Sequence, residues 1–246
     1  MMDKETITND ELSQRFEAAF NRIHNKLKAI SQQSEKAAFM ELLHTSARSH
    51  ASIRAHLDEL KQFAKLRNAI VHQKTEASYY IAQPHTEIVE RIEQIDRILS
   101  EPAEAATIAS SPVYTVEPDT LLVQVLEMIR DHKLAEYPVY EKGTCKGLLT
   151  GREILKWMAD QHTDGKISLT DVQVRDILPP TSDYIISFVE SKANIFDIES
   201  IFEEHQSQNK KLEAVLITPN GGADELPIGI ITSWDLTKNN DILLEQ

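Results

Sequence analysis

The chain has 246 residues, of which 41% are hydrophobic and 26% are charged, and its formal net charge is −13. These values are typical of a soluble globular protein with room for one large domain or two smaller ones. The single cysteine, Cys145, excludes an internal disulfide framework and is typical of a reducing, cytoplasmic compartment. No apolar run approaches membrane-spanning length, and residues 1–9 lack a signal-peptide core.

The negative charge is confined to one part of the chain. Residues 1–100 carry 14 Lys and Arg against 14 Asp and Glu, whereas residues 101–246 carry 12 against 25. This difference predicts two domains. Phosphate binding needs clustered Lys and Arg, so the acidic part is a poor nucleic-acid surface. Any RNA partner is therefore expected on the N-terminal part.

Residues 1–100 are predicted to be helical throughout. Apolar residues recur at spacings of three and four, which places each set on one helix face. The sets are Phe16, Phe20, Ile23, Leu27 and Ile30; Phe39, Leu42 and Leu43; Ile53, Leu57, Leu60, Ala64 and Val71; and Ile88, Ile92, Ile95 and Leu99. Four such helices predict a bundle, which a second copy could complete in a homodimer. Residues 101–111 are expected to be a linker.

Three polar residues interrupt the third set. At about 100° per residue, Arg67, Asn68 and His72 span roughly 140° of the helix surface and can converge on one pocket. The segment resembles the Arg-Asn-x-x-x-His signature of HEPN domains, helical dimers of which many are metal-independent endoribonucleases. The resemblance implies that His72 transfers a proton, that Arg67 holds the scissile phosphate and that Asn68 assists. The alternative is a helical dimerisation or docking module in which Arg67 and His72 are satisfied interface groups.

A heptapeptide occurs twice in the second part of the chain. Gly147 begins Gly-Leu-Leu-Thr-Gly-Arg-Glu, and Gly229 begins Gly-Ile-Ile-Thr-Ser-Trp-Asp. In each, an apolar strand ends at a threonine that can serve as N-cap of the next helix, with an acid at N3. Helix N-termini favour anions, and carboxylates accept hydroxyl protons, so each motif could hold a phosphate or a ribose diol. Capping without any ligand is the alternative for both threonines.

Each heptapeptide ends a predicted strand–helix–strand–strand unit. The order Thr-Val-x-Pro-Asp-Thr from Thr115, Tyr-Pro-Val from Tyr137 and Gly-Leu-Leu-Thr from Gly147 resembles that of CBS domains, which occur in tandem and bind adenosine derivatives. The second unit opens at residues 174–178 and continues through Ile185, a helix from about Asn194 to His205, and a strand at Ala214. We therefore expect an α+β chain: a helical bundle over 1–100, CBS repeats over 112–160 and 174–246, and linkers over 101–111 and 161–173.

The resemblance assigns site residues to both repeats. Asp235 would accept the two ribose hydroxyls, Thr232 would contact ribose or phosphate, and main-chain groups around Ala214 and Val215 would face the base. Thr150 and Glu153 hold the equivalent places in the first repeat, bordered by Tyr137 and Val139. Glu153 departs from the usual aspartate, so we expect tighter binding at Asp235.

These assignments predict an adenine-nucleotide-sensing regulator. The expected ligand is AMP or a similarly lightly charged nucleotide, because the acidic repeats offer few basic groups to a triphosphate. No metal is predicted. Trp157 and Trp234 are expected to pack in the core rather than stack on bases. The ligand would control the helical domain, either as a ribonuclease or, in a non-enzymatic sensor, as a surface for a protein partner.

Overall fold

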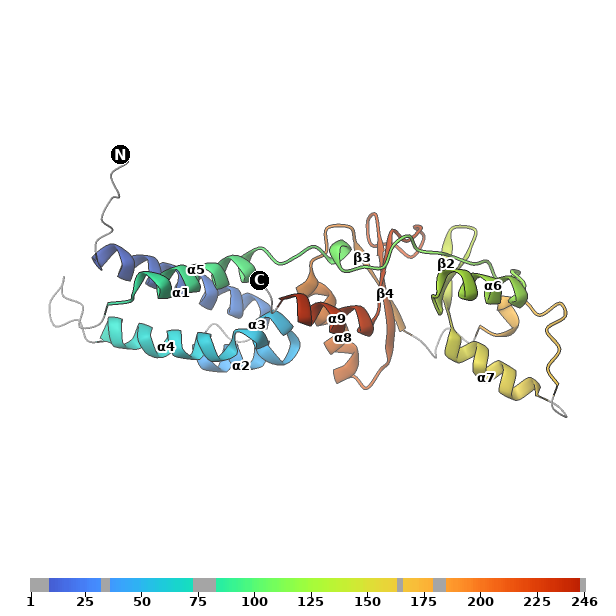
Figure 1. Ribbon diagram of the computed structural model, residues 1–246, viewed down its shortest axis with the longest axis horizontal. Helices are drawn as coiled ribbons and strands as arrows, with labels where there is room; N and C mark the ends of the chain where they lie inside the picture. Colours follow the sequence, from blue (N-terminus) through green and yellow to red (C-terminus); the bar gives the residue numbers. More distant parts are fainter. Residues whose placement is uncertain (1–8, 32–35, 73–82, 163–165, 179–184, 244–246) are drawn as a thin grey trace. The chain divides into compact units, whose positions relative to one another are not determined.

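The computed structural model describes residues 9–31, 36–72, 83–162, 166–178 and 185–243, with the side chains of 9, 71–72, 185 and 239–243 excepted. The chain divides into two compact units, residues 1–102 with 240–246 (unit 1) and residues 103–239 (unit 2). Unit 1 is helical and unit 2 contains two small sheets with helices, which confirms the predicted α+β class (Figure 1).

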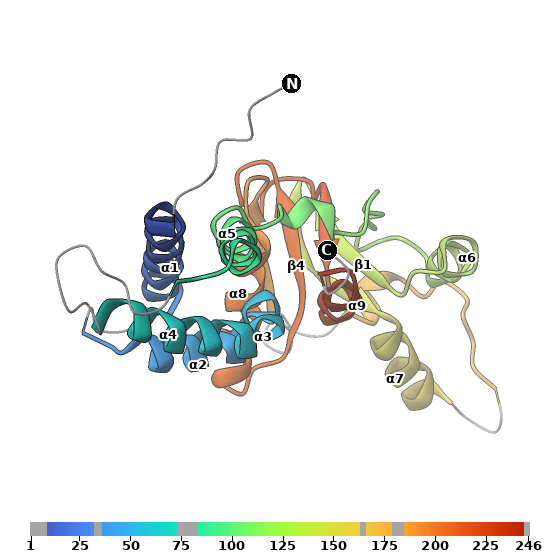
Figure 2. The same ribbon diagram turned by 60° about the vertical axis from the view of Figure 1, so that its left-hand side comes forward.

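The helices of unit 1 are α1 (Asn9–Ser31), α2 (Phe39–Ser49), α3 (Ala51–Ala55), α4 (Leu57–His72) and α5 (Thr86–Ser100). Helices α1 and α5 pack side by side, as the two ribbon views show (Figures 1 and 2). The predicted apolar faces form the core, in which Phe16, Ile23, Leu27, Leu42, Leu43, Ile53, Leu60, Ile92, Ile95 and Leu99 are fully buried.

The spacing of the third apolar set predicts one continuous helix, but the structure divides this set between two helices. Helix α3 ends at Ala55, and His56 has φ −102° and ψ 11° before α4 begins. Ile53 and Leu60 still face the same core from both sides of this break, so the apolar pattern continues across it.

Ion pairs join the helices of unit 1. Arg15 of α1 donates two hydrogen bonds to Glu93 of α5 at 2.9 and 2.8 Å, and Arg91 of α5 donates two to Glu59 of α4 at 2.7 and 2.9 Å. These hydrogen bonds hold the pKa values of both glutamates below their ordinary range. Because all four side chains are partly exposed, the pairs fix helix register more than they add stability.

Unit 2 contains the predicted repeat twice. The first comprises α6 (Leu122–His132), β1 (Glu136–Glu141), β2 (Thr144–Thr150) and α7 (Gly151–Gln161), and Val116 forms a parallel bridge to Val139 of β1. The second comprises β3 (Ile185–Glu190), α8 (Ile195–Ser207), β4 (Leu212–Thr218), β5 (Gly229–Ile231) and α9 (Ser233–Leu243). β1 pairs antiparallel with β2, whereas β4 lies between β3, which is parallel to it, and β5, which is antiparallel.

The segment that precedes each repeat in the sequence packs on the other repeat, so the two leading segments are exchanged. Residues 103–110, expected to be a linker, contain η1 (Ala105–Thr107) and pack on the second repeat, where Ala105 is fully buried. Residues 174–178, expected to open the second repeat, contain η2 (Val174–Asp176) and pack on the first, where Val174 is fully buried. Backbone hydrogen bonds fix both segments, including Ala105 N–H to Ala193 O and Val174 N–H to Thr120 O. The repeats therefore share parts of their cores.

The two motif glycines admit the exchanged segments. A Cβ on Gly229 would lie 2.9 Å from Cβ of Ala109, and a Cβ on Gly147 would lie 3.3 Å from Cδ1 of Leu178. A Cβ on Gly229 would require Ala109 to shift, and a Cβ on Gly147 would require Leu178 to move by a few tenths of an ångström. Each glycine thus permits a contact with the segment that leads into the other repeat.

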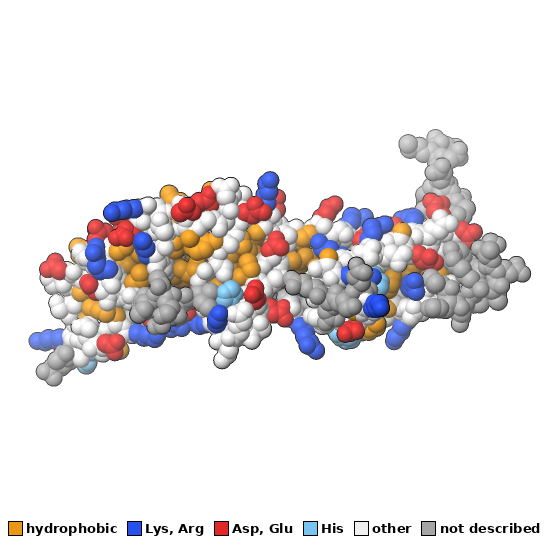
Figure 3. Space-filling model, turned by 180° about the vertical axis from the view of Figure 1, so that it is seen from behind, with side chains coloured by type: hydrophobic (Ala, Val, Ile, Leu, Met, Phe, Trp, Pro, Cys, Tyr) orange, Lys and Arg blue, Asp and Glu red, His pale blue; other side chains and the backbone are white. Residues whose placement is uncertain are grey.

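Exposed apolar side chains are concentrated in unit 2. Among the large hydrophobic residues that the structure describes, the exposed ones are Met40 in unit 1 and Val123, Leu155, Leu226, Ile228 and Trp234 in unit 2. Hydrophobic side chains also gather on the face of unit 2 seen in Figure 3. On α6, Val123 is 42% exposed, whereas Leu122 and Val125 are buried. Within the described ranges, no helix is long and apolar enough to cross a membrane.

Candidate functional site

Both motif threonines lie at the start of a helix. Thr150 accepts a hydrogen bond from the Glu153 amide at 3.3 Å and so caps α7. At the start of α9 the acid completes the cap instead, because the Asp235 carboxylate accepts from the Thr232 amide at 2.7 Å and from its hydroxyl at 2.8 Å. Helix capping by both motifs is therefore confirmed.

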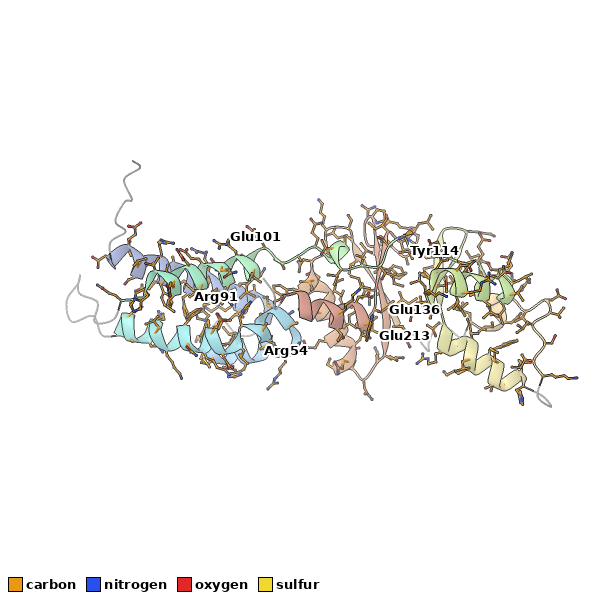
Figure 4. All side chains as sticks on the ribbon, viewed as in Figure 1. Arg54, Arg91, Glu101, Tyr114, Glu136 and Glu213 are labelled. Atoms are coloured by element: carbon orange, nitrogen blue, oxygen red, sulfur yellow. The ribbon has the colours of Figure 1, made fainter. Side chains whose placement is uncertain are left out.

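A pocket of about 360 Å³ opens beside the second motif. It brings together residues from three separate segments of unit 2. The second repeat contributes Ile230, Thr232, Trp234 and Asp235, and the first contributes Lys133, Leu134, Ala135 and Glu136, with Ser110, Pro112, Val113 and Tyr114 from the segment between η1 and α6. Figure 4 labels Tyr114 and Glu136. The pocket thus lies at the junction of the two repeats.

The polar groups of the pocket suit a sugar hydroxyl better than a polyphosphate. Asp235 is partly exposed, and its second oxygen accepts from the Ser110 hydroxyl at a long 3.4 Å. Lys133 is the one cation among the lining residues, whereas Glu136 and Asp235 are both carboxylates. Lys133 has φ 59°, a left-handed conformation that turns the chain between α6 and β1.

Aromatic side chains form part of the pocket wall. Trp234 is 73% exposed, so the expectation that it packs in the core is wrong. Trp234 lies in the first turn of α9, and Leu236, two positions further on, packs against the core of the second repeat. Tyr114 stacks on His132, with ring centroids 3.9 Å apart and planes at 20°. Trp157, by contrast, packs against the first repeat's core, as expected.

The first motif has a different environment. Glu153 is buried, and its carboxylate accepts from Nε of Arg152 at 3.0 Å and from Nζ of Lys156 at 3.4 Å. Arg152 also donates to Glu213 of β4 at 2.6 Å, and Lys211 pairs with the same carboxylate at 3.0 Å. Although partial desolvation acts against it, these two carboxylates raise the pKa of Arg152.

Four other predicted binding residues do not line the pocket at Asp235. Ala214 and Val215 are fully buried in β4, where the sheet pairs them with Ile186 and Ser187. Tyr137 and Val139 are fully buried in the core of the first repeat, and the Tyr137 hydroxyl donates to Leu134 O at 3.3 Å. Contacts of these residues with a ligand stay a prediction.

The HEPN-like residues lie on α4 of unit 1. The Arg67 side chain is half-buried and that of Asn68 is exposed, whereas the side chain of His72 lies outside the described residues. Arg67 approaches His24 of α1 closely enough that its charge, after burial and the charge of Lys28, lowers the pKa of that imidazole. The convergence of Arg67, Asn68 and His72 on one pocket stays a prediction.

The sequence analysis missed the residues that the first repeat contributes to the pocket. Residues 110–114 precede α6, and residues 133–136 run from the end of α6 into the first residue of β1, so both segments are far in sequence from Asp235. The bridge between Ser110 and Ile230 brings the first segment to the second motif. No local pattern indicates this pairing, because it follows from the exchange of segments between repeats.

Comparison with known families identifies part of unit 2. Residues 105–160 match the CBS domain. This match covers the first repeat, and the second repeat has the same order of strands and helices and the second copy of the heptapeptide. Both observations support a tandem CBS protein. The curated CBS domain-containing protein YhcV of Bacillus subtilis (strain 168) is 28% identical over 69 residues, or 28% of this chain; the match spans about half (49%) of YhcV.

Solved CBS structures are also similar to this chain. The CBS domain pair of protein MJ0100, in complex with 5′-methylthioadenosine and S-adenosyl-L-methionine, is 15% identical with a TM-score of 0.41, covering 56% of this chain and 94% of that one. The protein CBSX2 in complex with AMP is 17% identical with a TM-score of 0.39, covering 58% and 99%. In the part of this chain that the structure describes, no group of His, Cys, Asp and Glu is arranged to hold a metal ion.

Proposed function

We propose that unit 2 binds an adenine nucleotide of low charge in the pocket at Asp235, and that the protein is a nucleotide-sensing regulator. The observation that carries this proposal is the pocket itself, at the junction of the two repeats. It combines the carboxylate of Asp235, which caps α9, with an exposed indole, a phenol and one lysine. Its volume of about 360 Å³ falls in the range of small-molecule sites, roughly 300–1,000 Å³.

The charges of the pocket favour a nucleoside or a monophosphate. Asp235 accepts the ribose hydroxyls, and Lys133 is available to one phosphate group. Additional phosphates would meet Glu136 and an acidic unit without further cations in the pocket wall. Like-charge repulsion therefore lowers the affinity for ATP relative to AMP.

Binding is tested by calorimetry and thermal unfolding of the full chain. The panel contains adenosine, AMP, ADP, ATP, 5′-methylthioadenosine and S-adenosyl-L-methionine, the last two because a CBS pair has been solved with them. We expect AMP to bind more tightly than ATP. Absence of heat and of any thermal shift with all six compounds would refute a nucleotide sensor.

The activity that the nucleotide controls is assigned to the helical unit 1, and the specific candidate for that activity is RNA cleavage. It is favoured by Arg67, a half-buried guanidinium for which the described residues supply no ion-pair partner, next to the exposed amide of Asn68. Such a pair can bind a phosphate, and His72 five positions after Arg67 supplies a group that titrates near neutral pH. For the nucleotide to control this site, it must bind one arrangement of the chain more tightly than another.

RNA cleavage decides between the two outputs. A mixed RNA substrate is incubated with the full chain with and without AMP, together with His72→Ala and, as the matched control on the same unit, His85→Ala. Cleavage that is lost in His72→Ala alone supports a HEPN-type endoribonuclease. Intact RNA throughout, with a thermal shift by AMP, supports the non-enzymatic sensor whose helices dock a protein partner.

A further inference from the structure

The two motifs of unit 2 can be compared position by position. Arg152 occupies the sixth place of the first heptapeptide and Trp234 the sixth place of the second. The strand before each heptapeptide can be matched through its pairing. The third heptapeptide residue, Leu149 or Ile231, lies opposite Tyr137 or Val215, so Ala135 corresponds to Glu213 and Lys133 corresponds to Lys211. The residues around the first motif can therefore be matched with those that line the pocket at the second.

Charged side chains crosslink the two repeats at the first motif. The guanidinium of Arg152, from α7 of the first repeat, bridges the carboxylates of Glu153 and Glu213, the latter from β4 of the second. Both carboxylate side chains are largely buried, with 8% and 14% exposed. Lys156 and Lys211 pair with them from the outside. Figure 4 labels Glu213 on β4.

The equivalent positions at the second motif carry no such bridge. Trp234 stands in place of the arginine and is 73% exposed, while Ala135 stands in place of Glu213 and Lys133 in place of Lys211. The hydrogen bonds to Asp235 described above come from an amide and two hydroxyls, which are neutral donors. The second motif therefore faces an open pocket, and the first faces an ion-pair network.

We propose that the Arg152 network takes the place of a ligand at the first motif, so that each chain binds one nucleotide, at Asp235. This inference rests on the proposed function. A ribose hydroxyl would have to displace the guanidinium of Arg152 from Glu153, and so exchange a buried ion pair for a hydrogen bond from a neutral donor. Displacement would also leave Glu153 and Glu213 buried without their shared guanidinium, which is strongly unfavourable.

The number of sites is measured by titrating the full chain with AMP in a calorimeter. We expect a stoichiometry of one AMP per chain for the wild type. Asp235→Ala should weaken this binding about 140-fold and leave no site of wild-type affinity, because no second site remains. Two AMP per chain, or an undiminished single site in Asp235→Ala, would overturn the inference while leaving nucleotide binding intact. No heat from the wild type would instead refute the proposed function.

A second variant tests the role of Arg152. Arg152→Met keeps an unbranched apolar stem but removes the guanidinium that forms the bridge, so we expect lower thermal stability with an AMP dissociation constant within about twofold of the wild type. Thermal shift on the same sample shows whether the variant is folded. If it does not fold, Lys156→Met removes one pair of the network and carries the same expectation. A tenfold weaker AMP affinity in either variant would show that the network contacts the nucleotide, which contradicts the inference.

Discussion

Replacing Asp235 by alanine separates its two roles, helix capping and ligand binding. The carboxylate accepts two hydrogen bonds from Thr232 and lines the pocket. Loss of the cap should lower the free energy of unfolding by about 1 kcal/mol without any ligand. The effect on binding should be larger, because two ribose hydroxyls lose a charged acceptor at about 1.5 kcal/mol each, or about 3 kcal/mol together.

The expected thermal shifts follow from these free energies. AMP at 100 times its dissociation constant stabilises the wild type by about 2.7 kcal/mol. For a chain of this size, that corresponds to roughly 5–11 °C in the unfolding midpoint. A loss of about 3 kcal/mol weakens binding about 140-fold. At the same AMP concentration the variant then gains only about 0.3 kcal/mol, or roughly 1 °C.

Asp197→Ala is the matched control. Asp197 accepts from the Asn194 amide at 2.9 Å at the start of α8, in the same capping role as Asp235, but it lies outside the residues that line the pocket. Differential scanning fluorimetry with and without AMP should show similar losses of stability for both variants and a reduced AMP shift for Asp235→Ala alone. Equal AMP shifts in the two variants would refute the assignment of Asp235 to the ligand.

Two further predictions concern the two units separately. Burial and the charges of Lys28 and Arg67 lower the pKa of His24, whose Nε2 is buried without a hydrogen-bond partner among the described residues. As the pH falls, the unfolded chain therefore binds this proton before the folded chain does. The stability present above about pH 6.5 is then lost as the pH falls through the folded pKa. His24→Phe, which places an apolar ring beside Phe20 and Phe39, should remove up to about 1.4 kcal/mol per pH unit of that loss. Urea unfolding at pH 7 and pH 5 measures the change in the free energy of unfolding. The same dependence of this free energy on pH in the variant and the wild type would contradict the argument. In unit 2, the Tyr140 hydroxyl donates to Glu225 O of the β4–β5 loop at 2.9 Å, and burial raises the pKa of this phenol. Tyr140→Phe should lower the free energy of unfolding by about 1–3 kcal/mol, as thermal unfolding measures it. The control is Tyr137→Phe, which should cost less because its 3.3 Å hydrogen bond to Leu134 O is local. Equal losses in the two variants would refute the idea that the Tyr140 hydrogen bond fixes the β4–β5 loop.

Local pattern was sufficient for most secondary structure. Spacings of three and four marked the buried faces of α1, α2 and α5, since each such face has only the bundle interior to pack against. The heptapeptides marked the ends of β2 and β5 and the caps of the helices that follow, because capping involves residues only three positions apart. The break at His56 was missed because both flanking helices keep their apolar residues toward one core.

The sequence by itself determined that unit 2 is built from two similar repeats and that each repeat ends in a threonine and an acid at a helix N-terminus. Only the tertiary structure decided which of these ends is open. Residues 110–114 meet Asp235 because the segment before them pairs with the second repeat, residues 133–136 meet it where the two repeats join, and Arg152 reaches Glu213 across the same junction. Both pairings join residues more than sixty positions apart, through backbone bridges and buried charges that no local period encodes.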